Sequence, residues 1–452
     1  MKKKKLHPLI TGTLILTLTG LASRLIGFFY RIYLARLFGE EGMGIYQLIG
    51  PVLSLSFSLT AAGYQTAISK LVAENTARQK QHSFRPMLAG LSISFPLSLL
   101  CNLVIYHFSD YIAVTFLLEA RTAPMLRVLS FSIPVVAVHA CINGYFYGSK
   151  KTGVPAISQL FEQCVRVGCV FFMSTYALSK GASLTINVAV LGLVIGELGS
   201  MLVSVIAMYM ILWRPAHTFH PAHNLRPVTP PGMYRALMTM VLPLTLNRIV
   251  LNLLQSVEAV SIPAKLRLYG YDNATALSVY GVLTGMAMPL IFFPNALTGS
   301  VSVLLLPMIS EAYALKDMNK VKKYTLQTIK LCTLMGVICM SVFLLLGKWV
   351  GSHLFHSDLA GHFIMTLGFL CPFLYLDTTL SSILQGLGMA SRIFIMNVTS
   401  LLVRLGFVFC AIPVFGITGY LWGILTSQIL LSAMYLTCLI RMKIVLISTS
   451  DH

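Results

Sequence analysis

Charged residues are scarce in this chain. Only 10% of its 452 residues are Asp, Glu, Lys or Arg, while 56% are hydrophobic. Soluble domains usually carry about 25% charged residues. The apolar stretches are also too long and too numerous for the cores of soluble domains. The composition therefore excludes an ordinary soluble protein and predicts an all-α integral membrane protein.

Motifs for nucleotide hydrolysis and hydrolytic catalysis are missing as well. The chain has no GxxxxGK[ST] loop, so it encodes no ATP-driven pump, and it contains neither HExxH nor GxSxG. The predicted external connections, roughly 108–121, 261–275 and 348–360, are short. They leave little room for the catalytic loop that a membrane glycosyltransferase or ligase needs. We therefore predict a transporter without a cofactor, and not an enzyme.

Cysteine and histidine give no sign of a metal site or a disulfide framework. The nine cysteines lie in apolar stretches and form no CxxC pair, which is typical of small buried apolar side chains. His217, His220 and His223 form an HxxHxxH pattern. This pattern lies in a proline-rich linker, so a solvated loop is favoured over a metal site.

Twelve apolar stretches are long enough to cross a bilayer, which takes about 20 residues per helix. The first follows MKKKK and continues past Gly20, which is too long for a cleaved signal peptide. The candidate spans are roughly 9–34, 43–69, 87–107, 124–147, 154–178, 184–213, 236–260, 276–305, 327–347, 361–385, 393–413 and 416–440.

The net charge of +19 is distributed unevenly between the two sides of these spans. With the N-terminus inside, cytoplasmic segments hold 21 Lys and Arg and external segments hold 8. This bias follows the positive-inside rule. It predicts a multi-pass protein of the bacterial cytoplasmic membrane with both termini cytoplasmic, in contact with membrane lipids, and it argues against nucleic acid as a partner.

The segment 214–235 is the longest polar linker, and it contains five prolines. It divides the chain into an N-terminal six-helix bundle, 1–213, and a C-terminal six-helix bundle, 236–452. Shifting the sequence by 238 residues aligns 129–171 with 367–409 without a gap, and 10 of 43 positions are identical. The pairs that carry most weight are Pro134 with Pro372, Gly148 with Gly386, Arg166 with Arg404, and Gly168 with Gly406.

Because each half has an even number of helices, the halves are expected to have the same orientation, as two parallel bundles around a central cavity. Transporters of this plan bind substrate near the midplane and expose the cavity to one side and then the other.

Charged side chains inside the membrane are costly, so they usually face a cavity or a partner. Arg24, Arg166, Arg248 and Arg404 are the intramembrane cations and therefore the candidate substrate-binding residues. The acids Glu162, Glu197, Glu258 and Asp377, with His139 opposite Asp377 in the repeat, are candidate coupling or ion-pair residues.

Local spacing separates these arginines into two groups. Glu162 and Arg166 are four residues apart, so they share a helix face and suit a structural ion pair. Arg24, Arg248 and Arg404 have no acid within one turn. They either bind an anionic substrate or pair with an acid on another helix, and the sequence leaves both alternatives open.

The stretch SRLIGFFYRIYLARLFG at 23–39, followed by EEGMGIYQL and AISKLVAE, resembles the polysaccharide-biosynthesis branch of the multidrug/oligosaccharidyl-lipid/polysaccharide (MOP) exporter superfamily, to which lipid II flippases are related. The resemblance implies a cationic cavity that moves lipid-linked sugars of the undecaprenyl pyrophosphate type, with Arg24 at the position of a cavity arginine. Where lipid II flippases have an Arg-Asp pair, this chain has Tyr30 and Arg31.

This reading predicts a flippase for a lipid-linked oligosaccharide, such as a peptidoglycan or spore-cortex precursor, with a coupling cation as a candidate partner. Two alternatives stay open. One is a cation-coupled multidrug exporter of the same superfamily, which would have an acid-rich cavity. The other is a membrane-embedded glycan polymerase or ligase, which would depend on a catalytic carboxylate.

Overall fold

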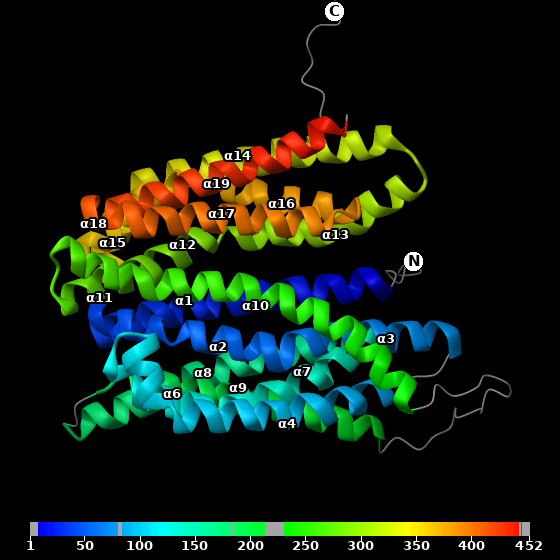
Figure 1. Cartoon of the computed structure of the whole chain (residues 1–452), viewed down its shortest axis with the longest axis horizontal. Helices are drawn as coiled ribbons and strands as arrows, with labels where there is room; N and C mark the ends of the chain where they lie inside the picture. The colour runs from blue at the N-terminus through cyan, green and yellow to red at the C-terminus, as the bar shows by residue number, and fades with distance from the viewer. Residues whose placement is uncertain (1–7, 80–83, 182–183, 213–229, 443, 445–452) are drawn as a thin grey trace, which may run out of the picture. The chain divides into compact units, whose positions relative to one another are not determined.

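A computed structural model describes residues 8–79, 84–181, 184–212, 230–442 and 444. Within these ranges the chain is helical and contains no strand (Figure 1). This agrees with the all-α membrane fold expected from the apolar stretches. The predicted HxxHxxH pattern at His217, His220 and His223 lies outside the described residues.

The chain forms two compact units, residues 1–30 with 48–256 and residues 31–47 with 257–452. In chain order the first elements are α1 (Pro8–Leu48), α2 (Gly50–Phe57), η1 (Ser58–Ala62), α3 (Gly63–Gln79), α4 (Arg85–His107), α5 (Ser109–Tyr111), η2 (Ile112–Phe116), η3 (Ala120–Thr122), α6 (Ala123–Ser130), α7 (Ser132–Gly148), α8 (Gly153–Ser179), α9 (Asn187–Leu212) and α10 (Pro230–Tyr269). They are followed by α11 (Asn273–Gly281), η4 (Val282–Ala287), α12 (Met288–Phe292), α13 (Asn295–Ala314), α14 (Met318–Val350), η5 (Gly351–Phe355), α15 (Asp358–Gly368), α16 (Cys371–Gly386), α17 (Ala390–Cys410), α18 (Ile412–Phe415) and α19 (Ile417–Arg441).

Two long helices, α1 and α10, each contribute residues to both units. The units therefore differ from the predicted halves at 31–47 and 236–256, and the division at the linker stays a prediction about topology. Helix α10 begins at Pro230, so the last six residues of the predicted linker are helical. Proline is well tolerated at a helix start, where its missing N–H would have no partner.

The described helices account for the twelve predicted spans. Nine are long and apolar enough to cross a membrane, and two bent pairs raise the number to eleven. The first of the nine, Thr17–Thr76, is 60 residues long. At 1.5 Å per residue it is about 90 Å, three times the hydrocarbon core, so it holds two spans. A break at Gly39, with φ 68°, separates them.

The two bent pairs occupy matching places in the 238-residue repeat. Helices α6 and α7 meet at 43°, and α15 and α16 meet at 56°. Pro134 and Pro372 lie in the first turn of the second helix of each pair. A proline there has no N–H with which to continue the hydrogen bonding of the preceding helix, so it favours a break at this point. The π-helical segments η2 and η5 precede the two pairs at nearly the same offset. These shared breaks support the internal repeat.

The second helix of each pair also ends in the same way. At the end of α7, Lys150 N–H bonds to Tyr147 O (3.1 Å) and Lys151 N–H to Phe146 O (2.9 Å). At the end of α16, the residues 238 positions later make the corresponding bonds, both at 3.0 Å. Both ends are Schellman caps, which need a left-handed residue. That residue is Lys150 (φ 59°) in one and Gly388 (φ 80°) in the other.

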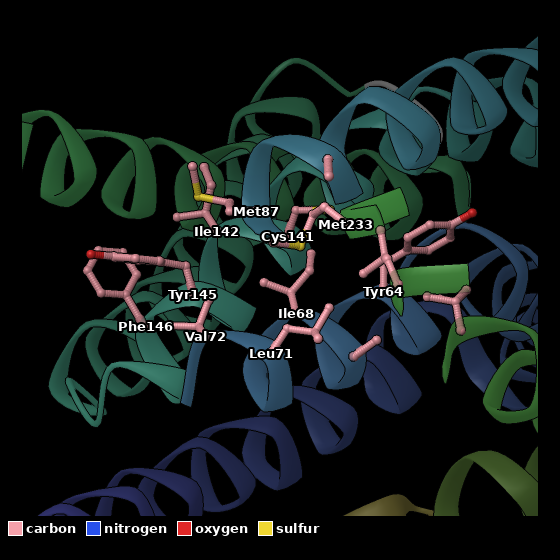
Figure 2. Close-up of a cluster of buried hydrophobic side chains, with 14 of the residues drawn as sticks. Tyr64, Ile68, Leu71, Val72, Met87, Cys141, Ile142, Tyr145, Phe146 and Met233 are labelled. Carbon is pink, nitrogen blue, oxygen red and sulfur yellow. The ribbon is translucent and has the colours of Figure 1, made fainter. Parts of the chain in front are cut away.

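Small residues allow the close helix packing behind this cap. An added Cβ at Gly148 would lie 2.5 Å from Ser69 O and 2.7 Å from Val72 Cβ. The repeat-related Gly386 lies against Leu306 O and Ile309 in the same manner. Buried side chains of α3, α4, α7, α9 and α10, among them Val72, form a core of the first unit (Figure 2). Helices α3 and α7 are therefore held rigidly together.

We expect Gly148→Ala to lower the free energy of unfolding by about 1–3 kcal/mol, because its methyl group overpacks against backbone atoms. Gly168→Ala is the matched control, since nothing lies within 4 Å of its added Cβ and alanine favours a helix interior. Melting temperatures in one detergent would compare them. Equal melting of both variants would contradict the close α3–α7 contact.

Candidate functional site

A cavity of about 670 Å³ opens in the first unit between α3, the end of α7 and α10. Three of its lining side chains are cations: Lys70, Lys150 and Arg248. None of the lining residues carries a carboxylate. The others are Gln65, Thr66, Ser69, Ala73, Tyr147 and Gly148. Cations, hydroxyl groups and an amide without competing acids suit an anion that also carries hydroxyl or amide groups.

Helix α10 presents Arg248 to this cavity because polar contacts and a small residue hold the helix against the segment from α2 to α3. Arg248 Nη2 lies 3.5 Å from Thr66 Oγ1. One turn further on, Asn252 Nδ2 donates to Ser58 Oγ and, at 3.3 Å, to Ser54 O. Gly63 leaves space for Thr245, which a Cβ at that position would clash with. The arginine is exposed and forms no ion pair among the described residues, so its charge is available to a ligand.

A second cavity of about 420 Å³ lies in the same unit. It is lined by Gly50, Leu53, Ser54, Phe57, Gln65, Val136, His139, Ala140, Asn143, Glu162 and Glu197. Gln65 therefore lines both cavities. The second is acidic where the first is cationic, so one unit contains neighbouring sites of opposite charge.

The titratable groups of this acidic cavity form one cluster. Arg166 forms an ion pair with Glu162, as the i,i+4 spacing predicts, and its Nη2 lies 3.8 Å from Glu197 Oε1. Glu197 Oε2 lies 3.9 Å from His139 Nδ1. Two acids thus share one arginine, so a proton on His139 or on an acid would bring the cluster closer to neutrality.

Polar side chains on its own helix, α7, and on α9 orient His139. Its Nε2 lies 2.6 Å from Asn143 Nδ2 and 3.0 Å from Ser200 Oγ. Asn143 Oδ1 in turn accepts a hydrogen bond from Ser204 Oγ (3.2 Å). Fixed polar partners of this kind hold the ring so that Nδ1 faces Glu197.

Arg404 does not stay unpaired in the second unit. Its Nη2 donates to Glu258 Oε2 (2.6 Å), and Tyr420 OH donates to Glu258 Oε1 (2.8 Å). Glu258 is 5% exposed. The sequence did not identify this partner, because the acid lies on α10, 146 residues from Arg404. Arg166 and Arg404 are both engaged by acids in this structure.

Asp377 occupies the position in α16 that His139 occupies in α7. Its carboxylate accepts hydrogen bonds from Ser432 Oγ (2.6 Å) and from Gln428 Nε2, both on α19. The side chain is buried, at 5% exposed. The repeat therefore places a polar cluster at the same helical position in each unit, although the titratable group differs.

Arg24 is exposed on α1 and lines neither of the two cavities. The described residues include no ion-pair partner for it and no group of three potential metal ligands. The sequence reasoning missed Lys70, Lys150 and Gln65. It assigned the two lysines to cytoplasmic segments, and only the fold shows that they share a cavity with Arg248.

Comparison with known proteins agrees with this architecture. Residues 9–313 match the model of a family described as polysaccharide biosynthesis protein, and residues 236–412 match the MatE model. Stage V sporulation protein B of Bacillus subtilis (strain 168) is 31% identical over 431 residues, covering 94% of this chain and 82% of that protein. The lipid II flippase MurJ of the same organism is 24% identical, with 84% and 73% covered.

Solved structures show the same fold. The inward-facing conformation of a multidrug resistance MATE family transporter of the MOP superfamily has a TM-score of 0.72 at 16% identity, covering 93% of this chain and 94% of that one. The inward closed conformation of lipid II flippase MurJ also has a TM-score of 0.72, at 14% identity, covering 94% and 87%.

The apolar helices of the described residues, together with the two family models and the sequence relatives, define a multi-pass membrane transporter of the MOP superfamily. Within that superfamily, the chain belongs to the polysaccharide biosynthesis protein family. Its similarity to flippases and transporters agrees with the prediction that it is not an enzyme.

Proposed function

We propose that this protein is a flippase that moves a lipid-linked oligosaccharide, a peptidoglycan or spore-cortex precursor, across the bacterial cytoplasmic membrane by alternating access. The observation that carries the proposal is the cavity around Arg248, with three cations and no carboxylate in its lining. A lipid-linked sugar of the undecaprenyl pyrophosphate type presents a diphosphate to such a site. The diphosphate offers several oxygens to a guanidinium fork.

The similarity to stage V sporulation protein B and to a lipid II flippase supports this substrate class. Arg24 is proposed as a second contact, because it is an exposed intramembrane cation without an ion pair among the described residues. Arg166 and Arg404 would reach substrate only after leaving their acids, so we place them second to Arg248 and Arg24.

Reconstitution tests the proposal. The purified full chain would be placed in liposomes that contain fluorescent lipid II, and an impermeant quencher would report how much label changes leaflet. Protein-dependent translocation is expected. An unrelated multi-pass protein at the same density controls for leakage. Translocation no faster than in that control, for lipid II and for a shorter undecaprenyl pyrophosphate sugar, would contradict the flippase function.

For coupling, we propose that the acidic cavity of Glu162, Glu197 and His139 takes up a proton or a small cation during transport. Glu197 is the central group, since it lies within 4 Å of both Arg166 and His139. Glu258 and Asp377 are the corresponding candidates in the second unit. Their hydrogen bonds suit a structural role equally well, so the first unit provides the sharper test.

We expect Glu197→Gln to remove the response of translocation to an imposed pH or sodium gradient, because glutamine keeps the shape but cannot ionise. Binding of substrate at the Arg248 cavity should persist. Glu311→Gln, an exposed glutamate of α13, is the matched control. If translocation by the Glu197→Gln protein still becomes faster when the gradient is applied, Glu197 is excluded as the coupling group.

The acidic cavity also favours one alternative, a cation-coupled multidrug exporter, which the MatE match and the MATE structures fit. The two functions differ in their ligand. An exporter would bind hydrophobic cations such as ethidium at Glu162 and Glu197, in competition with the coupling cation. A flippase would bind prenyl diphosphates at Arg248, and the cationic lining of the larger cavity favours this function.

A further inference from the structure

Lys150 has a backbone conformation that is unfavourable for its residue type. It is the left-handed residue of the Schellman cap that ends α7, with φ 59°. Glycine is the usual residue there, because a Cβ disfavours the left-handed region. The same cap at the end of α16 has Gly388 in that place, 238 residues later. The repeat therefore shows that the fold accepts glycine, and this unit nevertheless carries lysine.

The position of Lys150 places its side chain where it can bind a ligand. It lines the larger cavity together with Lys70 and Arg248. Lys70 comes from α3, and its ammonium group lies 3.9 Å from Glu74 in an exposed pair, which holds it only weakly. The three cations therefore belong to three different elements and converge on one space that contains no lining acid.

We propose that Lys70 and Lys150 form a loading site for the diphosphate-sugar headgroup at the end of the cavity opposite the membrane midplane, with Arg248 as the deeper contact. The inference rests on the proposed function and deepens it. Lysines suit loading because each is a flexible point charge that binds phosphate oxygens without a fixed geometry. Gln65, Ser69 and Tyr147 supply amide and hydroxyl groups for the attached sugar. Under the predicted orientation this end is cytoplasmic, where lipid-linked precursors would enter.

A simpler explanation is that Lys150 only compensates the negative end of the α7 helix dipole. The chain contains a matched case for it. Lys316 is also left-handed, with φ 58°, and also occupies the Schellman position at the end of a helix, α13. It lines neither cavity. If helix capping were the whole role, glycine at 150 and at 316 should have the same effects.

The test compares Lys150→Gly with Lys316→Gly in the full chain purified in detergent. Both variants should fold, and both should melt at or above the wild-type temperature, because glycine relieves the left-handed conformation. Binding of undecaprenyl diphosphate is measured by microscale thermophoresis. We expect Lys150→Gly to weaken it about tenfold, the scale of one exposed charge contact of about 1.4 kcal/mol. Lys316→Gly should bind like wild type, and Lys70→Gln should behave like Lys150→Gly.

The outcomes separate the loading site from the proposed function. If Lys150→Gly binds the probe like wild type while Arg248→Ala loses it, the loading site is wrong and the flippase function stands. If wild-type protein binds no undecaprenyl diphosphate, the proposed function itself is contradicted. Inorganic pyrophosphate serves as the lipid-free probe. If the wild-type protein binds pyrophosphate as tightly as undecaprenyl diphosphate, and Lys150→Gly weakens the binding of pyrophosphate, the diphosphate site is supported. The same result would contradict a lipid-linked substrate.

Discussion

Alanine at Arg248 is expected to lower translocation of lipid II about 10- to 100-fold. Charge-assisted hydrogen bonds contribute about 1.5–3 kcal/mol each, and each 1.4 kcal/mol corresponds to a factor of ten in binding. Arg248 has no ion pair among the described residues, and its one described hydrogen-bond contact, with Thr66 Oγ1, is long at 3.5 Å. Its removal should therefore leave the fold intact. Translocation by Arg248→Lys should also be impaired, because lysine keeps the charge but lacks the planar guanidinium fork.

The measurement is leaflet exchange of labelled lipid II, with melting temperature and expression recorded for each variant. Arg235→Ala is a suitable control, because that arginine lies on the same helix but outside both cavities. A well-folded Arg248→Ala protein that translocates lipid II at the wild-type rate would rule out Arg248 as a substrate contact. The same comparison for Arg24→Ala tests its proposed second contact.

The largest effect on stability is expected for Arg404→Met. This variant leaves the Glu258 carboxylate buried with only Tyr420 as its hydrogen-bond donor. Removing one partner of a buried ion pair typically lowers the free energy of unfolding by about 3–5 kcal/mol, because the remaining charge is uncompensated. Thermal unfolding in detergent, followed by tryptophan fluorescence, measures the change.

Two further variants make this result specific. Arg392→Met changes an exposed arginine on the same helix, α17, and should melt like wild type. The double variant Arg404→Met with Glu258→Gln should recover much of the lost stability, since it also removes the stranded charge. If Arg404→Met alone melts like Arg392→Met, the Glu258 pair contributes nothing to stability and Arg404 would be a better candidate for substrate binding.

Much of the fold was predictable because a bilayer imposes simple rules on a sequence. Each backbone polar group must be paired inside the segment that crosses the membrane, so every long apolar stretch becomes a helix. That rule predicted the twelve spans. The 238-residue offset paired Pro134 with Pro372 and Gly148 with Gly386, and the structure shows that bent helices and matching caps lie at these positions. Neither the bilayer rule nor the offset predicted that α1 and α10 are each divided between the two units, because hydropathy gives the length of a helix and not its neighbours.

The candidate site was only partly predictable. Glu162 and Arg166 pair as their spacing requires, since four residues bring two side chains onto one helix face. The partner of Arg404 was missed because Glu258 is distant in sequence and adjacent only in the fold. Lys70 and Lys150 were counted among the lysines and arginines of cytoplasmic segments and were not considered as site residues. No local pattern marks a lysine that faces a cavity.

The sequence by itself determined a helical, multi-pass membrane protein with an internal repeat and a small set of intramembrane charges. Composition and periodicity are sufficient for this, because the hydrocarbon core acts on each segment separately. Only the tertiary structure decided how those charges are used: Arg166 and Arg404 bind acids, while Arg248 joins two lysines in a cavity without acids. The reason is physical, since the energy of a charge depends on the few atoms around it, and those atoms come from helices that are distant in the chain.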